Sequence, residues 1–263
     1  MLLRELWVYP LKSAAGIAVS EMTLAPRGPL FDRRWMMVDP EGKFLTARKL
    51  HRLLLLKTEI RGDSLVLSGP GMAPLVVPTA DGRERIPVTI WKDTVDAALV
   101  GGEADAWLSA FLGTAGRLVV MDEQARRCMT HDAGFEQDEV SFADGMPVMV
   151  ANENSLLDLN ARAGENFSMQ RFRPNLVIDG AEPFAEEGWS GLRIGAVTFK
   201  AVKPCRRCVL TTIDPFTAEP HPRGEPMRTL SGYRKKEDGV YFGLNLTATN
   251  NGVIRRGDPV TVL

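Results

Sequence analysis

Two cysteines three positions apart, Cys205 and Cys208, are the residues of this chain best suited to bind a metal or to act as a nucleophile. Three cations, Lys203, Arg206 and Arg207, lie between or just before them. Because nearby positive charge favours the ionised form of a thiol, we expect a thiolate in this loop. Such a group could bind a soft metal or attack a substrate.

A C-x-x-C pair also occurs in dithiol redox motifs and in zinc sites. A redox dithiol needs the start of a helix, whereas the β-branched run at 209–213 predicts a strand that Asp214 and Pro215 end. A closed zinc site needs four ligands, and the chain has no second C-x-x-C. The only other cysteine and histidine side chains are Cys128, His51, His131 and His221. A zinc-stabilised, β-rich binding module therefore stays open as an alternative.

The composition is that of a globular protein. The chain has 263 residues, 44% of them hydrophobic, which is enough for one large domain or two small ones. Its 32 basic and 33 acidic residues give a formal net charge of -1, so no overall field favours nucleic acid or an anionic membrane. Three cysteines make no disulfide framework, and neither a signal peptide nor a long apolar segment is visible. We expect a cytoplasmic protein with no membrane or nucleic-acid partner.

Short apolar segments broken by Gly and Pro fill the first part of the chain and predict a β-rich or barrel-like domain. The strands are expected at 3–9, 35–38, 53–60, 64–67, 75–77 and 88–91, with turns at 39–42, 61–63 and 81–82. A helix at 103–112 and a strand at 117–121 follow. The polar segment 122–139 is the expected boundary, which divides the chain into domains at 1–120 and 121–263.

The second half predicts strands at 147–150, 176–178, 192–194, 197–202 and 259–263. Asn152 or Asn154 can cap a helix that Gly164 ends, and a short helix is expected at 226–234. The predicted fold class is α+β, mostly β.

The stretch 205–215, together with 224–230 and 251–258, resembles the MOSC domain, in particular the branch that contains the mitochondrial amidoxime-reducing component and its bacterial relatives. The likeness extends over nearly the whole chain. It implies a β-barrel-like MOSC domain packed on an N-terminal β-rich domain, with a cofactor cleft between them. In this family the second cysteine of the pair is the protein ligand of molybdenum in the molybdenum cofactor, so the resemblance assigns the catalytic and metal-binding role to Cys208.

Four more motifs, at 9–13, 32–35, 46–48 and 171–175, resemble segments that line the cofactor cleft of the family. The resemblance implies that Lys12, Ser13, Arg33, Arg48 and Arg173, with Asn175 as a further candidate, contact the pterin and its phosphate. Guanidinium forks and an ammonium group suit a phosphate. Each cation alone could equally be a solvated loop residue, and Arg173 could instead pair with a nearby glutamate.

Four further positions complete the expected site. Asn154 and Ser155 lie at a helix N-terminus, which is a natural place for an anion, although capping explains them as well. Arg206 and Arg207 would steady the anionic cofactor or fix the cysteine loop. Asn245 stands where some relatives have a tyrosine and is expected to support the site.

The resemblance implies a molybdenum-cofactor-dependent oxidoreductase that reduces small N-hydroxylated compounds, either bases or amidoximes. Some relatives continue into a ferredoxin-like domain, but this sequence stops at Leu263, so a separate ferredoxin- or flavoprotein-like electron donor is expected. The alternative is a sulfur-carrier or cofactor-binding protein that uses a persulfide or thiolate on the cysteine loop.

Overall fold

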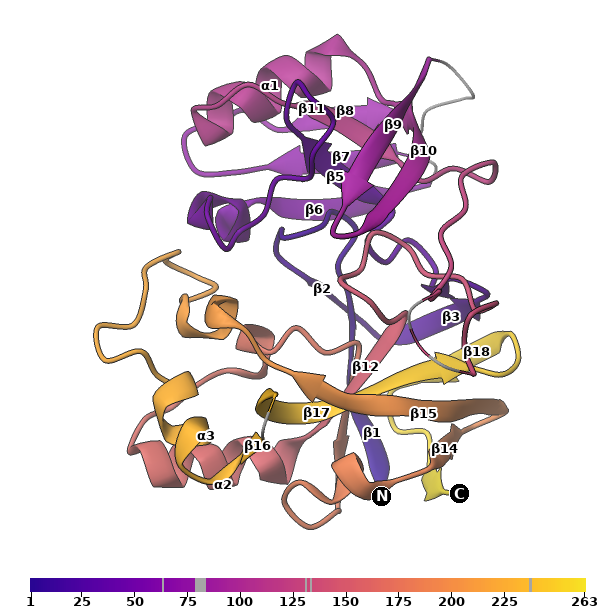
Figure 1. Ribbon diagram of the computed structural model, residues 1–263, viewed down its shortest axis with the longest axis vertical. Coiled ribbons are helices and arrows are strands. Elements are labelled where there is room, and N and C mark those ends of the chain that lie inside the picture. Colours follow the sequence, from indigo (N-terminus) through magenta and orange to yellow (C-terminus); the bar gives the residue numbers. More distant parts are fainter. Residues whose placement is uncertain (63, 79–83, 131, 133, 237) are drawn as a thin grey trace.

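The computed structural model describes residues 1–62, 64–78, 84–130, 132, 134–236 and 238–263. The expected turn at 81–82 and His131 lie outside these residues, as does one residue of the turn at 61–63. In Figure 1 the chain forms two parts: β5 to β11 with α1 in one, and β12 to β17 with α2 and α3 in the other. The first strand, β1 (Leu2–Val8), belongs to the second part although it opens the chain.

The largest sheet has nine strands among the described residues, in the order β19-β14-β15-β17-β12-β13-β1-β2, with β16 paired to β17. Besides β1, they are β2 (Ile17–Val19), β12 (Val148–Asn152), β13 (Leu176–Asp179), β14 (Gly191–Ile194), β15 (Val197–Arg206), β16 (Lys235–Lys236), β17 (Gly239–Ala248) and β19 (Val260–Val262). All five residues of β12 are buried, because one face packs on an aliphatic core and the other on the core beneath α2 and α3.

Three smaller sheets complete the β structure of the described residues. The four-stranded sheet contains β5 (Trp35–Val38), β9 (Arg85–Ile90), β10 (Asp93–Leu99) and β11 (Arg117–Val120). The others are β6 (Lys57–Arg61), β7 (Ser64–Ser68) and β8 (Leu75–Pro78), and β3 (Glu21–Ala25), β4 (Gly28–Pro29) and β18 (Gly252–Arg255). The predicted class, α+β and mostly β, is confirmed.

The three α-helices of the described residues lie where the sequence predicts helices. They are α1 (Gly102–Leu112), α2 (Glu153–Ala163) and α3 (Met227–Tyr233). Asn152 caps α2 by accepting a hydrogen bond from the amide of Asn154, and Gly164 ends it at a φ of 65°. No helix in the described part of the chain is both long and apolar enough to span a bilayer.

Two predicted strands are wrong in part or in whole. The segment 53–60 begins as the 3₁₀ helix η1 (His51–Leu55), and its strand starts only at Lys57. The run after the cysteines is the 3₁₀ helix η4 (Val209–Thr212). Its two threonine hydroxyls donate back to the carbonyl oxygens of Cys208 and Val209, so local side-chain hydrogen bonds close a tight turn that overrides β-propensity.

Gly243 in β17 is a position where close packing requires glycine. Its φ is 82°, and a Cβ atom there would lie 2.7 Å from the carbonyl oxygen of Val150 in β12. Gly164 has a similar φ but no atom within 4 Å of such a Cβ.

We therefore expect Gly164→Ala to lower the free energy of unfolding by about 1 kcal/mol, through backbone strain alone. Gly243→Ala should lower it by about 3 kcal/mol, because the backbone clash adds to the strain. Urea denaturation of both variants measures the difference, and equal losses would contradict the packing argument.

Candidate functional site

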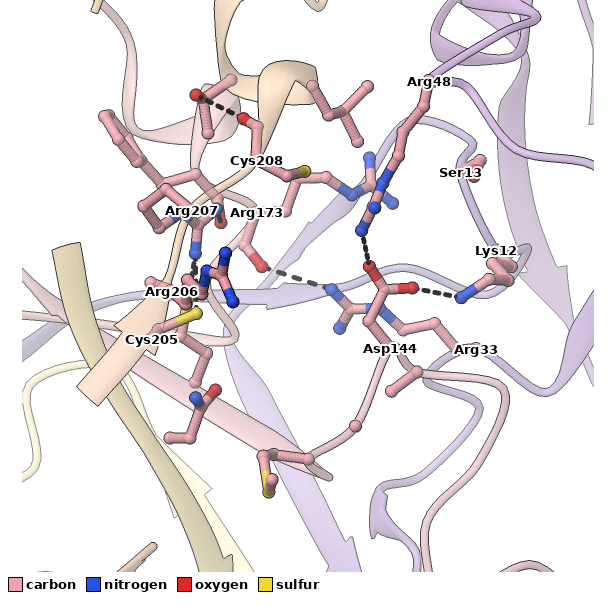
Figure 2. A pocket seen from close by; sticks show the side chains of 18 of the residues that line it. Lys12, Ser13, Arg33, Arg48, Asp144, Arg173, Cys205, Arg206, Arg207 and Cys208 are labelled. Atoms are coloured by element: carbon pink, nitrogen blue, oxygen red, sulfur yellow. Dashed lines mark hydrogen bonds and ion pairs between the residues drawn. The ribbon is translucent and has the colours of Figure 1, made fainter. Parts of the chain in front are cut away.

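A pocket of about 160 Å³ is lined by residues from both parts of the chain (Figure 2). Most of the residues expected in the site line it: Lys12, Ser13, Arg33, Arg48, Arg173, Asn175, Arg206, Arg207, Cys208 and Asn245. Asn154 and Ser155 do not. Segments that are far apart in sequence therefore converge on one hollow that carries six cationic side chains from this set.

The structure places Asn154 and Ser155 where they tie α2 to a neighbouring loop. The side-chain amide of Asn154 donates to the carbonyl oxygen of Ala181 at 2.7 Å. The Ser155 hydroxyl donates to the buried carboxylate of Glu186 at 2.9 Å and accepts from the amide of Phe184. Asn154 and Ser155 thus lie at the start of a helix, as expected, but they do not line the pocket.

The cysteine loop begins where β15 ends and is held by Arg207. Its guanidinium donates to the carbonyl oxygen of Phe172 at 2.6 Å and to the sulfur of Cys205 at 2.9 Å. Cys208 directly precedes η4, is half-buried, and turns its sulfur toward the pocket (Figure 2). All three cysteines are free thiols. Arg207 thus fixes the loop, and Cys208 presents its sulfur to the pocket.

A buried carboxylate, Asp32, organises one wall of the pocket. It is 1% exposed and accepts hydrogen bonds from the Tyr9 amide, the Asn175 side chain and Arg33, the last at 2.6 Å. Burial alone would lower the pKa of Arg33, but the contact with Asp32 outweighs it and raises that pKa. Asp32 therefore keeps a partly buried guanidinium charged.

Arg173 lies near Arg33 and pairs with no carboxylate of the described residues. Both guanidiniums pack over the ring of Tyr9, at 4.4 Å for Arg33 and 4.3 Å for Arg173. Burial, with the neighbouring charge of Arg33, lowers the pKa of Arg173 to about 10. One of its terminal nitrogens has no hydrogen-bond partner among the described residues. An anion in the pocket would satisfy this donor.

Three of the lining residues have a strained backbone. Ser13, Arg33 and Arg173 have φ values of 71°, 49° and 54°, in the left-handed region that glycine normally occupies. Each costs about 1 kcal/mol or more, and such residues cluster at functional sites. The strain sets the direction in which these side chains leave the backbone.

Asp144 is a central residue of the pocket that was not among the residues expected from the sequence. It accepts hydrogen bonds from Lys12 at 2.5 Å, Arg48 at 3.0 Å and the indole of Trp91 at 3.3 Å. Burial within the pocket acts to raise its pKa, but Lys12 and Arg48 outweigh this and hold the pKa well below its usual value. One feature of the sequence could have indicated Asp144: it lies shortly before the buried strand β12, as Arg33 lies shortly before the buried strand β5.

The described residues provide no ligand set for the zinc site that was kept as an alternative. No group of three or more His, Cys, Asp or Glu side chains within the described ranges could hold a metal ion. The imidazole of His221 lies 3.6 Å from Glu165 and packs edge-on against Phe167. Cys128 lines a separate hollow next to the pocket.

A thiol on a loop of the larger sheet, facing a cationic pocket shared with a second β-rich part, defines a protein of the MOSC class. Residues 1–115 match the MOSC N-terminal beta barrel domain, and residues 137–261 match the MOSC domain. The chain is 36% identical over 282 residues to human mitochondrial amidoxime-reducing component 1, covering 98% of this chain and 82% of that protein. It is 34% identical over 276 residues to mitochondrial amidoxime reducing component 2 of Rattus norvegicus, covering 97% and 81%. The chain belongs to this family of amidoxime-reducing components.

Among solved structures, the YUAD protein from Bacillus subtilis is similar with a TM-score of 0.45 and 8% sequence identity. The match covers 98% of this chain and 93% of that one.

The substitution Asp32→Asn tests the buried carboxylate. Removing the charge leaves Arg33 without its anion in a protein environment, so the free energy of unfolding should fall by about 3 kcal/mol. Glu123→Gln is the matched control, because Glu123 pairs with Arg34 at 3.0 Å but is 90% exposed, and its loss should cost about 0.5 kcal/mol or less. Chemical denaturation of both variants at pH 7 measures the two changes in the free energy of unfolding. Changes of similar size would show that the Asp32 carboxylate stabilises the fold no more than an exposed one does.

Asp144→Asn tests the ion pairs in the pocket through their pH dependence. The pKa of Asp144 is lower in the folded chain than its usual value of 3.8, so its contribution to stability is present above that value and is lost as the pH falls below it. At pH 7 the variant should be less stable by about 1 kcal/mol, since the carboxylate is partly exposed. Urea denaturation at pH 7, 5 and 3 should show this difference shrinking at the lowest pH. A difference that stays constant with pH would rule out the ion pairs as its source.

Proposed function

We propose that this chain is a molybdenum-cofactor-dependent oxidoreductase that reduces N-hydroxylated compounds, such as amidoximes and N-hydroxylated bases, with electrons from a separate donor protein. The observation that carries the proposal is the free thiol of Cys208 facing a pocket with seven cationic side chains. Membership of the amidoxime-reducing component family gives the reaction class.

The donor set of the pocket fits an anionic cofactor with a phosphate. The unpartnered nitrogen of Arg173 provides a hydrogen-bond donor, and Lys12, Arg33 and Arg48 provide positive charge. Because the cofactor would bring sulfur ligands of its own, the single thiolate of Cys208 would be enough to hold it without a cluster of protein ligands. We assign Cys208 to the metal and Lys12, Ser13, Arg33, Arg48 and Arg173 to the pterin and its phosphate.

The residues of the chain supply position and charge. Arg207 anchors the cysteine loop to Phe172 and so keeps the sulfur of Cys208 turned toward the pocket. Asp144 orients Lys12 and Arg48, and Asn245 with Arg206 forms the wall beside the thiol. When bound, the cofactor supplies the two-electron chemistry that removes oxygen from an N–OH group.

The electron donor in this proposal is a ferredoxin- or flavoprotein-like protein. The named relatives are mitochondrial proteins. For this chain we propose the cytoplasm, because three free thiols are typical of a reducing compartment.

Substituting Cys208 tests the metal assignment. Purified wild-type protein, produced in cells that make the cofactor, should carry about one molybdenum per chain, and Cys208→Ser should retain less than about a tenth of that amount. Cys205→Ser and Cys128→Ser are matched controls that should keep the metal. Elemental analysis gives the content, and reduction of benzamidoxime with an artificial electron donor gives the activity.

Other outcomes favour the alternatives. A labile sulfane sulfur with no bound molybdenum would support the sulfur-carrier hypothesis, and stoichiometric zinc would support the binding module. Equal molybdenum content in the Cys205 and Cys208 variants would contradict the assigned ligand.

A further inference from the structure

A second hollow, of about 700 Å³, adjoins the pocket that contains Cys208. The two share six lining residues, Asp144, Gly145, Met146, Cys205, Arg206 and Asn245. The second hollow is larger, and its lining adds two aromatic side chains, Trp91 and Tyr241. It therefore offers a ligand space beside the pocket that contains the thiol and outside the space that the cofactor would fill.

Trp91 occupies an unusual position in this hollow. It is the first residue of the two-residue turn that joins β9 to β10, and its φ is 56°. Hairpin turns of this kind place glycine at that point, and a bulky side chain there is an outlier with an energetic cost. The sequence pattern predicts only that Trp91 ends a strand.

The contacts of Trp91 hold its ring in place at the boundary of the two hollows. The indole nitrogen donates to Asp144 at 3.3 Å, and the guanidinium of Arg48 lies 4.5 Å from the ring. Phe44 packs against it at 4.8 Å between ring centroids. Although the ring is held in this way, Trp91 remains 41% exposed and lines the second hollow. A strained, fixed and accessible indole beside a site is suited to stacking on a planar ligand.

We propose that Trp91 is the platform on which the ring of an aromatic or heteroaromatic N-hydroxylated substrate stacks in the second hollow. This inference rests on the proposed function, because it assigns the substrate class of the same site. The shared wall at Cys205, Arg206 and Asn245 leads from this hollow to the thiol, so a ring on Trp91 could direct its N–OH group toward Cys208. Trp91 is a positioning residue that selects flat substrates over aliphatic ones.

The test compares benzamidoxime with acetamidoxime, which carries the same N–OH group without a ring. Stacking on an aromatic side chain predicts that Trp91→Ala raises the KM for benzamidoxime about tenfold. The KM for acetamidoxime should stay within about twofold, and the kcat values should change little, because binding alone is affected. Trp91→Phe, which keeps a ring, should restore most of the affinity.

Tryptophan fluorescence gives a readout that does not depend on turnover. Benzamidoxime should quench part of the emission of the molybdenum-loaded wild type, and this quenching should disappear in Trp91→Phe. Trp107→Phe is the matched control, because Trp107 lies in α1, lines neither hollow, and should leave the quenching unchanged. Molybdenum content should equal that of the wild type in every variant.

Three results would overturn the inference: equal KM changes for both substrates, quenching that persists in Trp91→Phe, or loss of molybdenum from Trp91→Ala, which would place Trp91 in the cofactor site. If the loaded wild type reduces neither compound, the proposed function fails instead. The stacking inference is then decided by quenching alone, since binding to Trp91 needs no turnover.

Discussion

The pocket depends on the contact between the buried carboxylate of Asp32 and the guanidinium of Arg33. The guanidiniums of Arg33 and Arg173 both pack over the ring of Tyr9 in a partly buried place. Within the described ranges of the chain, Arg33 has a carboxylate at hydrogen-bond distance and Arg173 has none. Burial, together with repulsion from Arg33, lowers the pKa of Arg173. This wall is thus more positive than its own partners can balance, and a bound anion would relieve it. The charge excess is a property of the fold and would be present before any ligand arrives.

The side chain of Asn175 links the loop that carries Asp32 to the large sheet. Asn175, which follows the loop of Arg173, donates to Asp32 and to the carbonyl oxygen of Trp7 and accepts from the amide of Met149. One buried amide side chain therefore connects the end of β1, the loop before β5 and the strand β12. Since β1 also pairs with β13 in the large sheet, the pocket walls cannot separate without breaking hydrogen bonds in the core.

The sequence was most informative where residue type alone limits the chemistry. The cysteine pair and the clustered cations could be predicted, because few roles suit several such residues in short motifs. Asp144 and Trp91 could not, since an aspartate ahead of a strand and a tryptophan at a strand end are common patterns that do not by themselves indicate a site. Asp144 contacts Lys12 and Arg48, and Trp91 contacts Arg48. In each of these contacts the two residues are more than 40 positions apart in the sequence. The pairing of β1 with β13 was likewise hidden, because strand pairing over such a separation is set by tertiary packing.

The exceptions to local rules nevertheless point to the site. Seven residues other than glycine have a positive φ in the described part of the chain, and four of them, Ser13, Arg33, Trp91 and Arg173, line the two hollows. Such conformations persist only where the surrounding structure compensates for them. Here the surrounding structure is two sheets with fully buried strands, β12 in one and β5 in the other, from whose ends and loops these residues project. A rigid β framework therefore tolerates strained loops, and the strain aims the cations and the indole at one shared space. This is the expected pattern when binding geometry, and not stability, determines a residue.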